Sequence, residues 1–241
     1  MLKFAFFDVD ETLVCLKSML SFQEFWCATY GTPCECRIFR AEMRKLRLGR
    51  ASREVMNRRY YAHFAGRSVA SVRDCAVEWF RRVERDIPNL FNPGIVARLL
   101  AHRNAGEEPV LVSGSFPDIL APVAARLGVT HVLCTRLVTA QGQYTGEIRL
   151  PQMIGAGKAR AVRDFLFASG TRAAECYAYG DDISDRFMLA AVGHPVAIAG
   201  HAAMESHAKQ KAWPIIDPVD GNAVRSPARP PVASGRNLTD P

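Results

Sequence analysis

Long apolar runs are absent from this 241-residue chain, which argues against a membrane protein. No stretch approaches the roughly 20 apolar residues that a membrane-spanning helix needs. The apolar start, residues 2–7, meets Asp8 and Asp10 almost at once, whereas a signal peptide needs a longer apolar stretch and a small-residue cleavage site. We therefore expect a soluble, cytoplasmic protein with no membrane partner.

Cysteines are too few and too scattered to suggest a disulfide framework or a zinc site. There are seven, an odd number in a chain that is not small. Without an export signal, this count favours free thiols over disulfides. Cys34 and Cys36 form the only close pair, and no second Cys or His pair near them completes a zinc spacing.

Acidic residues are outnumbered by basic ones, 24 to 31, and much of the basic excess lies between residues 37 and 59. No recognised nucleic-acid-binding motif or interleaved aromatic pattern accompanies this charge, so we expect no nucleic-acid partner. An ordinary solvated helical face is the interpretation that we favour. The alternative is that the charge attracts an anionic substrate towards a cleft.

Short apolar strands alternate with amphipathic helices from residue 86 onwards, a pattern typical of an α/β protein with a doubly wound parallel sheet. We expect helices over residues 95–105, 117–127, 158–169 and 184–192. We expect strands over residues 2–7, 109–112, 131–134, 176–179, 196–198 and 213–216, with a hairpin over 137–148.

Residues 16–85 break this alternation with helical apolar stripes, such as Met56, Tyr60 and Phe64 after a possible N-cap at Ser52. The sequence therefore predicts a Rossmann-like catalytic core, residues 1–14 and 86–217, with an inserted helical cap domain, residues 15–85. Residues 218–241 are rich in proline and lack an apolar period, so we expect a disordered tail.

Four segments carry residues suited to chemistry, each where a strand ends or a helix begins. Asp8 and Asp10 follow the first strand, where one carboxylate could attack and the other act as acid and base. Ser113 and Gly114 end an apolar strand and suit a phosphate oxygen. Taken singly, the first pair could be a solvated turn and the second ordinary turn chemistry.

Of the other two segments, one carries a lysine and the other carries three aspartates. Lys158 opens a helix after Gly155-Ala156-Gly157, where it could neutralise phosphate charge or be an exposed structural lysine. Asp181, Asp182 and Asp185 lie at a strand-to-helix turn, where they could bind a hard cation through oxygen or cap the helix.

The four segments together, in this order, resemble the motifs of the haloacid dehalogenase superfamily of phosphatases. The family patterns Asp-x-Asp-x-Thr-Leu, Ser or Thr after a strand, Lys, and Gly-Asp-x-x-x-Asp are matched by residues 8–13, Ser113, Lys158 and residues 180–185. The match extends over residues 2–216. The helical insert after the first motif resembles the phosphoserine phosphatase-like branch, which has a helical cap.

The resemblance implies a Mg²⁺-dependent phosphomonoester hydrolase acting on a small phosphorylated metabolite. Asp8 would be the nucleophile that forms an aspartyl-phosphate, and Asp10 the acid and base. The carboxylates of Asp8 and Asp181 and the backbone carbonyl of Asp10 would hold Mg²⁺, with Asp185 orienting its waters or Lys158. Ser113, Gly114 and Lys158 would bind the phosphoryl oxygens.

Two departures from the family pattern accompany the match. Many members have Gly where this chain has Glu11, and many have Ser and Asn where it has Asp182 and Ser184. The expected metal ligands are kept, but the geometry around them could differ. A phosphotransferase using the same intermediate and a non-catalytic phospholigand-binding protein are the alternatives, and the substrate and oligomeric state stay open.

Overall fold

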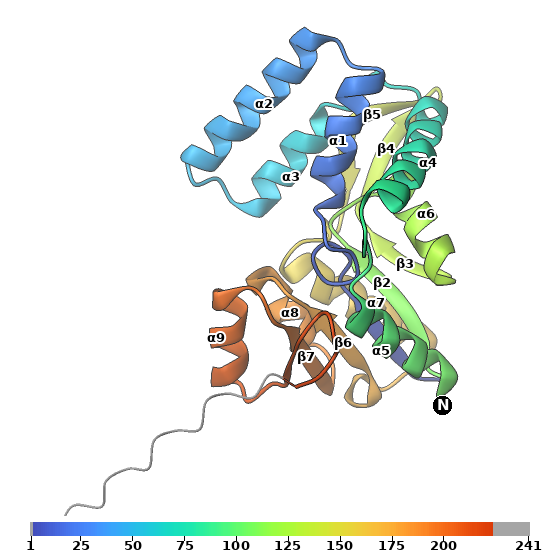
Figure 1. Cartoon of the computed structure of the whole chain (residues 1–241), viewed down its shortest axis with the longest axis vertical. Helices are drawn as coiled ribbons and strands as arrows, with labels where there is room; N and C mark the ends of the chain where they lie inside the picture. Colours follow the sequence, from blue (N-terminus) through green and yellow to red (C-terminus); the bar gives the residue numbers. More distant parts are fainter. Residues whose placement is uncertain (1, 224–241) are drawn as a thin grey trace, which may run out of the picture.

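The structure, a computed structural model, describes residues 2–223 and is built around a six-stranded parallel sheet (Figure 1). The strand order is β3-β2-β1-β6-β7-β8, and every neighbouring pair is parallel. This confirms the predicted Rossmann-like, doubly wound α/β core. The strands are β1 (Phe4–Phe7), β2 (Glu108–Ser113), β3 (His131–Cys134), β6 (Tyr177–Gly180), β7 (His194–Ile198) and β8 (Ile215–Ile216).

Helices cover both faces of the sheet because alternate side chains of each buried strand point to opposite faces. On β1, Phe4 and Phe6 belong to the core shared with α7, α8 and α9, whereas Ala5 and Phe7 belong to the core shared with α5 and α6. These helices are α5 (Pro93–Asn104), α6 (Pro117–Leu127), α7 (Ala156–Ser169), α8 (Arg186–Leu189) and α9 (Ala202–Gln210).

Four further helices lie between β1 and β2 in the chain and form the upper part of the molecule (Figure 1). Ser52 caps α3 as the sequence predicts, since its hydroxyl accepts a hydrogen bond from the Val55 N–H. The helices are α1 (Ser18–Thr29), α2 (Pro33–Leu48), α3 (Arg53–Ala62) and α4 (Val69–Asp86). Within residues 2–223, none of the helices combines the length and apolarity that crossing a bilayer would take.

An antiparallel hairpin lies against this helical part rather than joining the main sheet. It consists of β4 (Arg136–Ala140) and β5 (Gln143–Arg149), and β5 contacts α3. The Phe64 and Tyr144 rings meet edge to face with centroids 6.3 Å apart. The hairpin that the sequence predicts therefore extends the apolar packing of α1 to α4.

Cys27 and Cys36 form a disulfide, so the expectation of free thiols is wrong for this pair. The turn between α1 and α2 brings their Cα atoms to 5.8 Å, within the range that a disulfide spans. Their separation of nine residues gives no hint of this contact in the sequence. The other five cysteines are free.

Most boundaries differ from the sequence-based ones by a few residues, and two regions differ in a way that a local contact describes. The helix expected over 184–192 is a 3₁₀ turn, η2 (Ile183–Asp185), followed by a short α8, because the Asp182 carboxylate accepts the Ser184 N–H and tightens the turn. The predicted tail starts at Pro218, and within the described residues the Pro218 carbonyl accepts a hydrogen bond from the Gly94 N–H at 3.0 Å. The remainder of that tail, 224–241, lies outside the described residues.

Candidate active site

The acidic motifs converge where the strand order reverses. Asp8 follows β1 and Asp181 follows β6, and these strands are parallel neighbours. Ser113 ends β2 on the other side of β1. Ligands of open α/β sheets bind at this edge, outside the carboxyl ends of the strands at the switch point, so the three side chains occupy the expected place.

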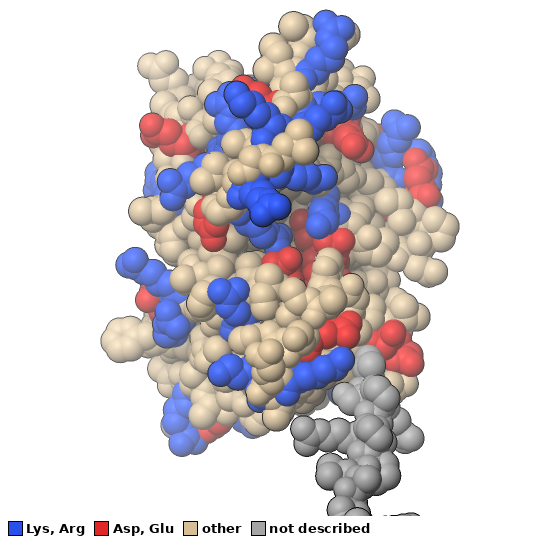
Figure 2. All heavy atoms as spheres, turned by 90° about the vertical axis from the view of Figure 1, so that its left-hand side faces the viewer, with Lys and Arg blue, Asp and Glu red and all other residues tan. Residues whose placement is uncertain are grey.

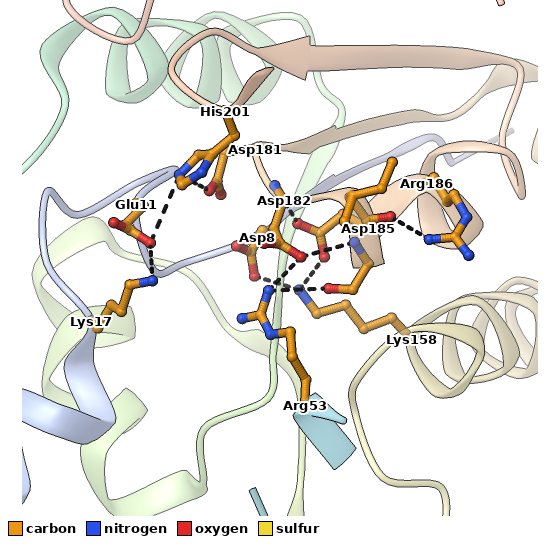
Figure 3. A network of polar contacts seen from close by, with 12 residues as sticks. Asp8, Glu11, Lys17, Arg53, Lys158, Asp181, Asp182, Asp185, Arg186 and His201 are labelled. Carbon is orange, nitrogen blue, oxygen red and sulfur yellow. Dashed lines mark hydrogen bonds and ion pairs between the residues drawn. The ribbon is translucent and has the colours of Figure 1, made fainter. Parts of the chain in front are cut away.

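Lys158, from the first turn of α7, joins two of the carboxylates into one buried group (Figure 3). Its Nζ donates to Asp8 Oδ1 at 2.5 Å and to Asp185 Oδ1 at 2.7 Å. All three residues are at most 6% exposed, so water hardly screens the two ion pairs. Lys158 is therefore no exposed structural lysine.

One ammonium does not neutralise the three carboxylates gathered here. Burial raises the pKa of Asp8 to about 7, and it raises the pKa of Asp181 and of Asp185 to about 6 each. Lys158 lowers all three values without offsetting the burial. Burial alone would lower the pKa of Lys158, but Asp185 and Asp8 outweigh it and raise that pKa. The site thus has an excess of negative charge.

That excess suits a hard divalent cation. Carboxylate oxygens of Asp8, Asp181 and Asp185 lie within 4.8 Å of one another. Within the described part of the chain, Asp10 Oδ1 is buried and has no hydrogen-bond partner. Oxygen-only donors in a buried acidic group are what Mg²⁺ prefers, so the residues present fit this ion.

Ser113 is the last residue of β2, and Gly114 follows it. The Ser113 Oγ accepts the Ser115 N–H at 3.0 Å, which leaves its own proton free for a ligand oxygen. The Gly114 carbonyl accepts hydrogen bonds from Asn57 Nδ2 at 3.2 Å and from the Tyr61 hydroxyl at 2.5 Å, both on α3. These two bonds connect the loop after β2 to the helical part.

A cavity of about 340 Å³ opens above these residues, between the sheet edge and the helices α1, α2 and α3. Asp8, Asp10, Ser113, Gly114, Lys158, Asp181 and Asp185 all line it. Figure 2 shows its mouth as a hollow with red carboxylates inside and blue Lys and Arg side chains over the helices above. The structure therefore brings every residue of the sequence-based site to one cavity.

Comparison with known proteins is consistent with this geometry. The model of the haloacid dehalogenase-like hydrolase family matches residues 5–190. The chain belongs to this family. A protein named "probable phosphatase" in Mycobacterium tuberculosis is 31% identical over 222 residues, 88% of this chain and 74% of that protein. A phosphoserine phosphatase of the same organism is 33% identical over 220 residues, 88% of this chain and 70% of the relative.

Solved structures agree on the fold. A substrate-bound phosphoserine phosphatase superposes with a TM-score of 0.62 at 17% identity, over 86% of this chain and 90% of that one. At this identity the likeness concerns the fold alone, and it is the fold of the phosphoserine phosphatase-like branch. The family and its named relatives together support a phosphatase enzyme.

Glu11 is the first departure from the pattern of the haloacid dehalogenase-like hydrolases. The backbone conformation at this position explains why many members have glycine there. Its φ is +62°, in the left-handed region that glycine enters without strain. The Glu11 carboxylate pairs with Lys17 at 2.8 Å, beside the start of α1. A glycine in many family members therefore suits this turn, and the glutamate adds a charge at the rim of the cavity.

The second departure is the presence of Asp182 and Ser184, and both residues contact the helical part. Asp182 forms an ion pair with Arg53 at the start of α3, and Arg53 Nη1 also donates to the Ser184 Oγ at 3.4 Å (Figure 3). Burial works against ionisation of Asp182, but the Ser184 N–H and Arg53 outweigh it and lower its pKa. Asp182 is thus held as a carboxylate outside the Lys158 group.

Sequence reasoning gave no role to two residues that hold Asp181. The Thr12 hydroxyl donates to Asp181 Oδ1 at 2.6 Å, and His201 Nε2 lies 3.2 Å from Asp181 Oδ2. Thr12 was visible as part of the first motif. His201 follows β7, which ends at Ile198, so it stands after a parallel strand just as Asp8 and Asp181 do, and that position is the signal that could have found it.

Proposed function

We propose that this chain is a Mg²⁺-dependent phosphatase that hydrolyses small phosphomonoesters through an aspartyl-phosphate on Asp8. The observation that carries the proposal is the buried Asp8–Lys158–Asp185 group, with Asp181 within metal-bridging distance, at the floor of a cavity of metabolite size. A carboxylate beside a fixed ammonium can attack phosphorus despite the like charge of the phosphate.

In the first step a carboxylate oxygen of Asp8 forms a bond to phosphorus while the bond to the leaving oxygen breaks. Asp10 gives its proton to that oxygen. Burial raises the pKa of Asp10, which favours the protonated form that this step needs. The products are the free alcohol and the phosphorylated Asp8.

The phosphoryl oxygens carry the charge that must be offset. Lys158, the Ser113 hydroxyl and the Gly114 N–H are the donors that we assign to them. Lys158 stays protonated throughout, since Asp8 and Asp185 raise its pKa. When bound by Asp8, Asp181 and the Asp10 carbonyl, Mg²⁺ supplies the further positive charge that the transition state requires.

In the second step Asp10, now a carboxylate, takes a proton from water. The water oxygen bonds to phosphorus, the bond from phosphorus to Asp8 breaks, and phosphate leaves. Asp8 and Asp10 return to their starting forms, so one water is consumed for each ester cleaved.

The helices α1 to α4, which fill the predicted cap segment 15–85 and end one residue beyond it at Asp86, act in this proposal as a cap that covers the substrate and excludes water. Contacts between α3 and the core support a closed arrangement. Gln152 Nε2 donates to the Glu54 carbonyl and to Asn57 Oδ1, both at 2.9 Å, and Arg53 pairs with Asp182. Opening the cap requires these contacts to break.

Release of phosphate from a generic aryl phosphate tests the proposal. We expect turnover with Mg²⁺ and its loss in excess chelator, with the Asp8→Asn variant as the background control. Equal activity with chelator would refute the metal-dependent mechanism. Adding a primary alcohol and looking for a new phosphate ester separates hydrolysis from transfer to an acceptor.

A further inference from the structure

We call the side of the cavity that α1, α2 and α3 form its roof, and the side with Asp8, Lys158, Asp181 and Asp185 its floor. The roof and the floor differ in charge. Among the described residues, the cap helices contribute no carboxylate to the lining, but they contribute Arg47 and Arg53. Both come from the basic segment 37–59. The leaving group of a bound phosphomonoester would extend from the floor towards this roof.

Arg47 is the cation that is available to a ligand. Arg53 already pairs with Asp182, and Lys17 at the rim pairs with Glu11. Arg47, in the last turn of α2, lines the cavity, and its guanidinium makes no hydrogen bond or ion pair with any residue from 2 to 223. An unpaired guanidinium facing a cavity suits a carboxylate or a phosphate, which it can bind with two parallel hydrogen bonds.

Much of the rest of the roof is apolar and adaptable, although Asn57 and the Tyr60 hydroxyl also lie there. Met19, Met43 and Met56 line it, and with Met153 on the core side they are four of the seven methionines in the chain. Thioether side chains fill irregular spaces and accept ligands of varied shape. A leaving group with a short apolar stretch would pack here.

Tyr60 supplies a second observation that points to a ligand. It lines the cavity, its side chain is 1% exposed, and its hydroxyl has no hydrogen-bond partner within the part of the chain that the structure describes. A buried hydroxyl without a partner costs free energy that a ligand oxygen can recover.

We infer that the natural substrate is a phosphomonoester whose leaving group has a short apolar body and an anionic end, recognised by Arg47. An ammonium at that end finds no carboxylate on the roof and meets Arg47 instead. The inference rests on the phosphatase activity proposed above and names the substrate class of the same site.

Three phosphomonoesters with a three-carbon leaving group test it: one ends in a methyl group, one in a carboxylate and one in an ammonium. We expect kcat/KM to be highest for the carboxylate and lowest for the ammonium. We expect kcat/KM to differ by about tenfold between the carboxylate and methyl esters, and again between the methyl and ammonium esters. A factor of this size corresponds to one partly solvated charge-assisted hydrogen bond.

Charge reversal on α2 identifies the residue responsible. Arg47→Glu should lower the carboxylate-to-ammonium ratio of kcat/KM by about tenfold or more, since it replaces attraction by repulsion. Arg44→Glu is the matched control. It makes the same change one turn earlier on α2, at a residue that is exposed like Arg47 but lies outside the cavity lining, and should leave the ratio unchanged.

The outcomes separate the two proposals. Chelator-sensitive release of phosphate with no preference for the carboxylate, or a ratio that Arg47→Glu does not change, overturns the inference and leaves the phosphatase standing. An equal change in the Arg44→Glu variant assigns the effect to long-range charge and also overturns the role of Arg47. No release from any of these esters or from the aryl phosphate overturns both.

Discussion

The floor and the roof of the cavity are built in opposite ways. The floor holds Asp8, Lys158, Asp181 and Asp185, each at most 6% exposed and each held by hydrogen bonds or ion pairs from neighbouring strands and helices. Cations and methionines from α1, α2 and α3 form the roof, where the Arg53 side chain is 55% exposed.

This difference separates two tasks. Side chains that must meet phosphorus at a fixed distance gain from rigid neighbours, because small displacements cost rate. Side chains that recognise a leaving group can be mobile and can vary without disturbing the floor. We therefore expect substitutions on the floor to change kcat by orders of magnitude and substitutions on the roof to change which ester is preferred.

Asp8→Asn should have the largest effect. In the proposed mechanism it keeps the shape of the side chain but removes the charge of the attacking oxygen and weakens metal binding. We expect kcat to fall by roughly four to six powers of ten, as for other enzymes that lose their nucleophile. Steady-state assay and mass mapping of trapped protein measure this, and the variant should carry no phosphoryl group. Full activity, or a phosphoryl group on Asp181 or a serine, would contradict the mechanism.

Asp10→Asn should be milder, since it leaves the nucleophile in place. Loss of the acid and base should lower kcat by ~10²–10⁴. An ester with a good leaving group needs little protonation, so the variant should still become phosphorylated on Asp8. Its phosphoenzyme should persist because water is not activated, and rapid quench with mass mapping would detect it. Rapid loss of the phosphoenzyme would assign the base to another residue.

The residues of the floor were predictable because they directly follow strands, and a buried strand can be recognised in the sequence as an apolar run. An apolar run followed by an acidic residue marks Asp8, and Gly180 before Asp181 leaves room for the Asp185 side chain, whose Cβ would lie 2.8 Å from an added Cβ. Helix α6 was predicted with the bounds that the structure has, since Pro117 starts it and Gly128, at φ +64°, ends it.

The roof was not predictable in the same detail. The basic residues of α2 and α3 repeat too densely to show which of them face a cavity, so nothing set Arg47 apart from Arg44. The Cys27–Cys36 disulfide depends on a turn between two helices, and α9 buries only Met204 and Ala208, too few for an apolar stripe. Such features follow from tertiary packing.

Because the floor has an excess of carboxylates, we expect both the stability of the protein and the effect of Mg²⁺ on it to depend on pH. The ordinary pKa of these carboxyls is 3.8, but in the folded protein Asp8 has a pKa of about 7 and Asp181 and Asp185 have values of about 6. Between those values the folded state holds more protons than the unfolded state, so stability of the metal-free protein falls as pH rises from about 4 to about 7.

Mg²⁺ competes with those protons, so its stabilising effect should grow over the same pH range. At a concentration 100 times the dissociation constant we expect Tm to rise by about 5–10 °C at pH 7.5, and by much less at pH 5. Thermal melts with Mg²⁺ and with chelator measure this, with Asp181→Asn as the control that should lose the gain. An equal gain at both pH values would mean that the ion binds elsewhere.

Glu11, at the rim between floor and roof, should give the smallest effect. Glu11→Gly relieves a left-handed backbone but loses the pair with Lys17, whose side chain is 52% exposed and whose contribution is therefore small. Glu11→Gln loses the charge and keeps the strained backbone. We expect the Gly variant to exceed the Gln variant in free energy of unfolding by about 1 kcal/mol. Urea denaturation in chelator measures the difference without metal binding. A Gly variant less stable than the Gln variant would show that the contacts of the side chain, and not the backbone, set the cost of this turn.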